Sequence, residues 1–216
     1  MQTIEIPRIP SLDSLASPDV IVRELETGGV RASIGNVNWP EKFPYAPLAT
    51  LTAAHNGTHL YIDFFVRGLG LRAENSADQS PVSSDSCVEV FLSPEHSGEY
   101  WNFEFNCIGA INASHRRVRP EPVRLDAHQL ASVRRYPSCG TSPFSEKAGV
   151  HAWNLLVVIP LDLMGIESCA PGTRLAGNFY KCASASAWPH YLSWAPIHTE
   201  KPDFHRPEFF GTLILK

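Results

Sequence analysis

The sequence contains no long apolar run, no basic start followed by an apolar segment, and no linker rich in Gly and Ser or in charge. The first absence argues against a membrane-spanning helix, which needs about 20 consecutive apolar residues. The second argues against a secretory signal and predicts a cytoplasmic location, or one outside the cytoplasm if a leader segment preceded the chain. The third favours a single domain over residues 1–216, which is long enough to bury a substantial core.

Positive charge is also scarce. Eighteen Lys and Arg residues against 22 Asp and Glu residues give a net charge of −4, which argues against nucleic acid or an anionic membrane as the main partner. The basic cluster is short and comprises His115, Arg116 and Arg117, with Arg119 nearby. We expect it to form a solvated loop or to supply a counter-ion to carboxylates on the sheet.

Motifs for cofactors and for redox or zinc chemistry are missing as well. The five cysteines are odd in number and widely separated, and none forms a C-x-x-C pair. Cys87 and Cys107 fall inside strand patterns, where a free thiol behaves as a small apolar residue, so we expect a reducing compartment. There is also no nucleophile elbow, phosphate loop or dinucleotide fingerprint, so no cofactor and no catalytic residue is predicted.

The feature that organises the rest of the chain is the stretch 85–109. Apolar residues alternate along its first half, Pro94 and Gly98 interrupt it, and alternation resumes after them, which predicts two strands joined by a turn. On the second strand the polar residues are Asn102, Glu104 and Asn106, so one face is core and the other is a polar row. Such a row of amide, carboxylate and amide suits a polyhydroxylated ligand, and it equally suits solvent.

Short strand patterns recur over most of the chain. One hairpin is predicted around Asn56-Gly57, because this pair readily occupies the two positive-φ positions of a tight turn. His55 and His59 flank that turn, which excludes a helical zinc pair. Many short strands, few helices and regular turn signals predict an all-β, antiparallel β-sandwich of the jelly-roll or immunoglobulin-like two-sheet kind, with one or two short helices.

The helix that is easiest to predict lies near the amino terminus. Ser17 suits the N-cap, Pro18 suits the first helical position, and Gly28-Gly29 suits the end. The first strand is expected just before it, over residues 3–6, at a sheet edge because prolines follow.

Aromatic and polar residues gather in the segment 174–211. A sugar is recognised by an aromatic plane against its C–H face and by planar polar groups that hold adjacent hydroxyls, and residues of both kinds are present here. In the alternative interpretation, Trp188 and Trp194 cover an edge of the core and Asp203 pairs with Arg206 to shape a turn. Both interpretations stay open on residue chemistry.

Five segments carry a likeness to a known family: DSCVEVFLSP, YWNFEFNCIG, NFYKC, PHYLSWAPI and PDFHRPEFFG. With these segments the chain resembles the carbohydrate-binding, family 9-like domains, relatives of the family 9 carbohydrate-binding modules found with bacterial glycoside hydrolases. It implies a β-sandwich that holds a mono- or oligosaccharide between aromatic side chains, without catalysis, in carbohydrate catabolism. The family also implies that structural calcium is possible, although Asp63, Asp85 and Glu89 are not spaced as a loop site.

The resemblance also implies roles for particular residues. Trp194 matches the tryptophan of a short late strand, and Phe204-His205 stand where the family has a second late aromatic, a tryptophan. Asn178 and Lys181 match polar positions, but at odd spacing they cannot share one strand face, so a bulge is needed or only one of them reaches the ligand. The predicted ligand-binding residues are therefore Trp194, Asn102, Glu104, Asn178, Lys181, Phe204 and His205.

Two other functions fit the same residues. Glu89 and Glu104 could serve as the acid and base of a glycoside hydrolase, because adjacent strands supply the required separation of about 5 to 9.5 Å. Glu89 could equally pair with an arginine such as Arg116. The third possibility is a sandwich that binds a protein partner through its aromatic loops.

Overall fold

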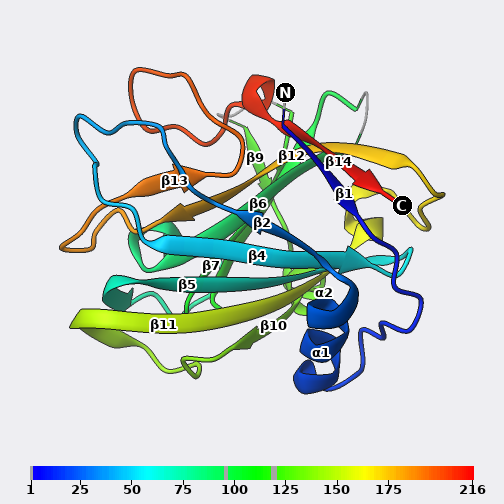
Figure 1. Ribbon diagram of the computed structural model, residues 1–216, viewed down its shortest axis with the longest axis horizontal. Helices are drawn as coiled ribbons and strands as arrows, with labels where there is room; N and C mark the ends of the chain where they lie inside the picture. Colours follow the sequence, from blue (N-terminus) through cyan, green and yellow to red (C-terminus); the bar gives the residue numbers. More distant parts are fainter. Residues whose placement is uncertain (1, 95–96, 118–120) are drawn as a thin grey trace.

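The computed structural model describes residues 2–94, 97–117 and 121–216, which form two β-sheets and two α-helices. In Figure 1, β4, β5 and β11 of the smaller sheet run side by side across the lower half of the view, and β1, β14 and β12 of the larger sheet lie above them. The predicted two-sheet β-sandwich is confirmed. Apart from the parallel pair β1 and β14, the neighbouring strands of both sheets are antiparallel.

The larger sheet has the strand order β1-β14-β12-β6-β7-β8-β9, and β13 joins β12 to β3 beside this path. Its strands are β1 (Thr3–Ile6), β3 (Asn36–Val37), β6 (Cys87–Pro94), β7 (Tyr100–Asn106), β8 (Ile111–Arg116), β9 (Pro122–Arg124), β12 (Thr173–Cys182), β13 (Tyr191–Ser193) and β14 (Gly211–Leu215). The smaller sheet has the order β10-β11-β5-β4-β2. Its strands are β2 (Val30–Ser33), β4 (Leu48–His55), β5 (His59–Ala73), β10 (Arg134–Pro137) and β11 (Phe144–Pro160).

One hydrophobic core lies between the two sheets. Alternate residues of β6, such as Val88 and Val90, meet alternate residues of β5 and β11, such as Ile62 and Leu155, and all four are fully buried. This packing follows from strand geometry, since every second side chain points to the same face. Each fully buried aliphatic side chain contributes about 1.5–3 kcal/mol to folding.

The helices cover the outside of the sandwich. Helix α1 (Pro18–Gly28) follows Ser17 as predicted, although the Ser17 side chain makes no capping hydrogen bond. It packs Ile21 and Leu25 on Tyr61, on the face of the smaller sheet turned away from the core. The other helical segments are α2 (Ala127–Ser132) and the 3₁₀ turns η1 (Val82–Ser84), η2 (Leu161–Met164) and η3 (Pro207–Phe209). Within the described ranges, no helix combines the length and apolarity that a membrane crossing requires.

The predicted hairpin between β4 and β5 is confirmed, but its turn is built differently. Gly57 has φ +106°, whereas Asn56 is not among the positive-φ residues of the described chain. Instead, the Asn56 side-chain oxygen accepts the backbone N–H groups of Thr58 (3.0 Å) and His59 (2.8 Å). The Asn side chain thus substitutes for a second left-handed residue, as in an Asx-turn.

Candidate functional site

The polar row of β7 lies on the face of the larger sheet that is turned away from the smaller sheet. Phe103 and Phe105 point into the core between the sheets, and Asn102, Glu104 and Asn106 point the opposite way, as the alternation predicts. All three polar side chains are nevertheless buried, because loops cover this face. The row is therefore a buried layer and not a solvated one.

Hydrogen bonds hold the row in place. Asn102 Nδ2 donates to Glu104 Oε1 and Asn112 Nδ2 donates to Glu104 Oε2, both at 3.0 Å. Arg116 Nε donates to Asn102 Oδ1 (2.9 Å). Asn106 serves another purpose, since its Nδ2 donates to Asp85 Oδ2 (3.0 Å). The row thus has one carboxylate, Glu104, whose position is set by the amides on either side.

The basic cluster was predicted to be either a counter-ion to sheet carboxylates or a solvated loop, and its residues take both roles. Arg116 supplies positive charge beside Glu104, as a counter-ion to a sheet carboxylate would. Arg117 is exposed and pairs with Glu99, which also accepts a hydrogen bond from His115 Nε2 (2.6 Å). Arg119 lies outside the described residues.

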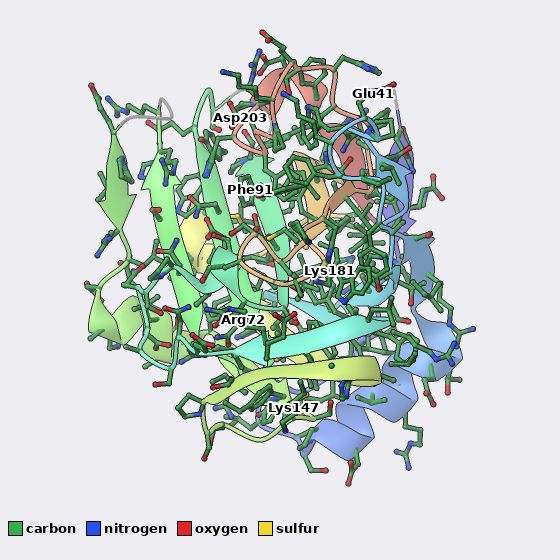
Figure 2. The ribbon with its side chains drawn as sticks, turned by 90° about the vertical axis from the view of Figure 1, so that its left-hand side faces the viewer. Glu41, Arg72, Phe91, Lys147, Lys181 and Asp203 are labelled. Atoms are coloured by element: carbon green, nitrogen blue, oxygen red, sulfur yellow. The ribbon has the colours of Figure 1, made fainter. Side chains whose placement is uncertain are left out.

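A cavity of about 190 Å³ opens above β6 and β7. The residues that line it come from η1, β6, β7, the end of β12 and the loop after it, β13 and the loop before η3: Ser83, Glu89, Glu104, Cys182, Ser184, Tyr191, Pro202, Asp203, Phe204 and His205. In Figure 2, Asp203 lies near Phe91, and Lys181 lies lower in the view, toward the smaller sheet. The cavity is thus on the outer face of the larger sheet and not between the two sheets.

Aromatic rings form one wall of the cavity. Phe204 stacks on Tyr180, with ring centroids 4.2 Å apart, and His205 lies 4.8 Å from Phe91. The Tyr180 hydroxyl donates to the Phe204 carbonyl oxygen (3.1 Å), which fixes the backbone of the loop. Tyr191 meets the edge of Phe204 at 6.1 Å. The two residues predicted in place of the family's second tryptophan, Phe204 and His205, therefore both line the cavity.

Two carboxylic acids form the floor. Glu89 on β6 and Glu104 on β7 are direct cross-strand partners, so their Cβ atoms are about 4.5–5.5 Å apart. Burial raises the pKa of both groups, strongly for Glu89. For Glu104, the hydrogen bond from Asn112 and the positive charge of Arg116 oppose this shift. The pair can accept hydrogen bonds when ionised, and it can donate one when a proton is retained.

Four of the predicted site residues lie away from the cavity lining. Asn102 supports Glu104 from the side. The amide of Asn178 pairs with the backbone of Ala195, accepting its N–H at 2.8 Å and donating to its carbonyl oxygen at 3.0 Å. Lys181 lies on the opposite face of β12 from Asn178, as its odd spacing predicts, and its Nζ lies 2.9 Å from His190 Nε2.

Trp194 is placed differently from what the resemblance implies. Its backbone N–H donates to the Phe179 carbonyl oxygen (2.8 Å), which extends the ladder between β12 and β13 by one residue and turns the indole toward the core. There the ring meets Phe179 edge-on at 5.7 Å and is 3% exposed. The indole therefore offers no open face for a ligand in this structure.

Tyr191 is the aromatic residue that sequence reasoning missed. It precedes Trp194 by an odd number of residues, and side chains at odd spacing along a strand point to opposite faces. Once Trp194 faces the core, Tyr191 faces the cavity, where it is half-buried. Cys182 and the two serines of the lining were also missed, because loop and register determine their position and no local pattern marks them. Asp203 was noted in the segment 174–211 but was not among the predicted ligand-binding residues.

Comparison with known proteins gives consistent results. The sequence model of the family described as carbohydrate-binding family 9 matches residues 25–215. A crystal structure from Bacteroides uniformis, provisionally described as that of a carbohydrate-binding protein, is 33% identical, with a TM-score of 0.93 over 100% of this chain and 99% of that one. A search of curated proteins found no match.

Two more distant structures share the fold. Both are of a family 9 carbohydrate-binding module from Caldicellulosiruptor kristjanssonii. The complex with glucose is 14% identical, with a TM-score of 0.58 over 100% of this chain and 96% of that chain. The complex with cellotriose is 11% identical, with a TM-score of 0.60 over 100% of this chain and 94% of that chain. At these identities the likeness shows that the two-sheet architecture is shared.

Proposed function

The chain belongs to carbohydrate-binding family 9, and from that premise we propose that it binds a saccharide in the cavity above Glu89 and Glu104. The observation that carries the proposal is the mixed lining of this cavity. The rings of Tyr191, Phe204 and His205 lie beside two buried carboxylic acids, and all five residues are held by the larger sheet or by the loop packed on it.

This lining matches the chemistry of a sugar ring. Aromatic rings pack against the C–H groups of a sugar, and carboxylate oxygens accept hydrogen bonds from its hydroxyls. Hydrogen bonds to charged groups in a buried site are strong, because water competes weakly there. The exposed edge of the cavity adds Asp203 as a third carboxylate.

The size of the cavity limits what enters it. Pockets for drug-sized ligands occupy about 300–1,000 Å³, and this cavity has about 190 Å³. We therefore expect it to hold a single sugar ring, either a monosaccharide or one end of an oligosaccharide. The complexes of the related fold with glucose and cellotriose support the choice of these two compounds as first probes. The same likeness leads us to propose a role in carbohydrate catabolism.

The test is a glycan array followed by titration calorimetry with the sugars that bind, on three variants. We expect Glu104→Gln and Tyr191→Ala each to weaken binding about 10-fold or more, since a hydrogen bond to a charged group is worth about 1.5–3 kcal/mol and a buried aromatic contact a similar amount. Trp188→Ala is the matched control, because Trp188 is 45% exposed and lies outside the lining. Its affinity should be unchanged.

Each alternative function predicts a different result in these experiments. Unchanged affinity in both cavity variants would place the site elsewhere. No binding to any glycan, together with self-association or a co-purified protein, would favour a partner-binding sandwich. Turnover of aryl glycosides that disappears in Glu104→Gln would favour the hydrolase, with Glu89 and Glu104 as acid and base.

A further inference from the structure

Three side chains that can bind a metal meet at the floor of the cavity. Cys87 and Glu89 are alternate residues of β6, so they share a face. Cys182 at the end of β12 is the cross-strand partner of Cys87 and points the same way. The Cys182 thiol donates to Glu89 Oε1 at 3.1 Å, and Cys87 Sγ lies 3.8 Å from the same oxygen. All three ligand atoms lie within 4.8 Å of one another, and all three residues are buried.

We propose that Cys87, Glu89 and Cys182 form a binding site for a thiophilic divalent cation, with Zn²⁺ as the reference ion. In a tetrahedral zinc site with Zn–S near 2.3 Å and Zn–O near 2.1 Å, neighbouring sulfurs are about 3.8 Å apart, and a sulfur and an oxygen about 3.6 Å apart. The observed sulfur–oxygen separations, 3.1 and 3.8 Å, bracket the second of these values, and all three ligand atoms lie within 4.8 Å of one another. The three atoms are therefore close enough together to occupy three corners of such a tetrahedron.

The donor set agrees with this ion. Two cysteine sulfurs and one carboxylate oxygen are ligands that Zn²⁺ takes, and soft sulfur disfavours Mg²⁺ and Ca²⁺. Glu89 is 2% exposed, and its hydrogen-bond partners in the described part of the chain are the two thiols. A buried carboxylate needs a proton or a cation to offset its charge. The ammonium group of Lys181 contacts His190 and the Cys182 carbonyl oxygen instead.

The position of the cluster leaves one corner of the tetrahedron open. Glu89 and Cys182 line the cavity, and Glu104 is the cross-strand neighbour of Glu89. An ion held there has its fourth position directed toward the cavity, where water or a ligand oxygen can complete the coordination, as in zinc sites that keep an open position. The cluster shares the cavity with the proposed sugar site, but metal binding does not depend on sugar binding.

The other cysteines provide an internal control. Among the residues described by the structure, no second group of three or more His, Cys, Asp or Glu side chains is gathered as closely. Cys107 and Cys139 lie outside this group, and the Cys107 thiol donates to the Arg72 carbonyl oxygen at 3.6 Å, so a double variant of these two removes two thiols without touching the proposed ligands.

The experiment uses the whole chain, fully reduced, with five free thiols verified under denaturing conditions. Co²⁺ is the optical probe, because cysteine thiolates bound to it give a charge-transfer band, and Zn²⁺ is added in competition. We expect one Co²⁺ per chain, displaced by Zn²⁺. The band should be lost in Cys87→Ser and Cys182→Ser and retained in the Cys107→Ser/Cys139→Ser variant.

Glu89→Gln keeps both thiols and tests the carboxylate. Even a residue that only supports a ligand costs about 10–100-fold in metal affinity when it is replaced, so we expect at least that loss here. A second readout is the Tm, which Zn²⁺ should raise in the wild type and in the Cys107→Ser/Cys139→Ser variant but not in Glu89→Gln. This readout also identifies any variant that fails to fold.

Two results would overturn the proposal. The first is reduced wild-type protein that binds neither Co²⁺ nor Zn²⁺. The second is metal binding that persists unchanged in folded Cys182→Ser and Glu89→Gln. Calorimetry with glucose and cellotriose on the metal-free protein, and metal titration without sugar, separate this outcome from failure of the proposed sugar site, since each activity is then measured without the other ligand.

Discussion

At the scale of single residues, the outer face of the smaller sheet contains a largely buried carboxylic acid, Asp63, whose pKa is raised by burial. Asp63 on β5 lies beside α1, where Asn154 Nδ2 donates to its Oδ2 at 3.1 Å. Burial raises the pKa of Asp63 to about 6, the hydrogen bond from Asn154 opposes the shift, and the charge of Glu26 adds to it. Because the folded protein binds this proton more tightly than the unfolded chain, Asp63 favours folding at low pH.

This shift predicts how stability depends on pH. The contribution of Asp63 is fully present below pH 3.8, its unfolded pKa, and is lost as the pH rises through about 6. We expect Asp63→Asn to raise the free energy of unfolding at pH 7 by about 2–3 kcal/mol, since one pKa unit corresponds to about 1.4 kcal/mol. At pH 3.5 it should change little.

Urea unfolding at a series of pH values between 3.5 and 7 measures this difference. Glu41→Gln is the control, because Glu41 is exposed and its replacement should leave the pH profile unchanged. A stability difference between Asp63→Asn and the wild type that is equal at both ends of the pH range would rule out titration as the cause.

At the scale of elements, the short strand β13 decides which residues face the cavity. Its ladder with β12 turns Trp194 inward, and the indole then lies over Gly211 at the start of β14. A Cβ atom at Gly211 would collide with Trp194 Cζ3 and would lie 2.7 Å from the Gln2 backbone oxygen. Gly211 is thus required by the close approach of two neighbouring segments and not by its backbone conformation.

We therefore predict that Gly211→Ala costs about 1–3 kcal/mol of stability, the usual range for overpacking a core. The cost should be smaller in a Trp194→Phe background, where the outer ring atoms are removed, so the two substitutions should be non-additive. Thermal and urea unfolding of both single variants and the double variant measure the coupling.

Gly35→Ala serves as the comparison, because the nearest atom to its Cβ would be the Ser33 side-chain oxygen at 3.2 Å. It should cost much less than Gly211→Ala. If Gly211→Ala lost the same stability in the wild-type and Trp194→Phe backgrounds, the Trp194 ring would not be the group that collides with the added Cβ atom.

At the scale of the whole molecule, the two sheets share one core, in which side chains of β5, β6, β11 and β12 are packed together. Trp153 comes from the smaller sheet and Trp194 from the segment attached to the larger one, and both are buried in that core. Neither sheet can therefore keep its buried face if the other unfolds, which favours a single cooperative unit.

We predict one unfolding transition for the chain. In urea, far-ultraviolet circular dichroism and tryptophan fluorescence should give the same midpoint, and calorimetric and van't Hoff enthalpies should agree. Of the five tryptophans, Trp153 is the one in a strand of the smaller sheet, so the fluorescence that remains in Trp153→Phe reports on the larger sheet and the loops, and the signal lost relative to the wild type reports on the smaller sheet. Midpoints that differ between these two reporters would mean that residues 1–216 do not behave as one domain.

Much of the architecture followed from local patterns. The strands β6 and β7, the hairpin of β4 and β5, and helix α1 were predicted close to their observed bounds. The lining of the candidate site was predicted less completely. Glu104, Phe204 and His205 line the cavity, whereas Trp194, Asn178 and Lys181 are buried away from it, and Tyr191 was not foreseen.

The sequence by itself determined that the chain is a β-sandwich with a polar row on one face of β7, because side-chain alternation is a local consequence of strand geometry. Only the tertiary structure decided what the row faces. Pairing of β6 with β12 brings Cys87 to Cys182, and pairing with β7 brings Glu89 to Glu104. Strand register and loop closure depend on packing between distant segments, so they cannot be predicted from any local stretch of the sequence.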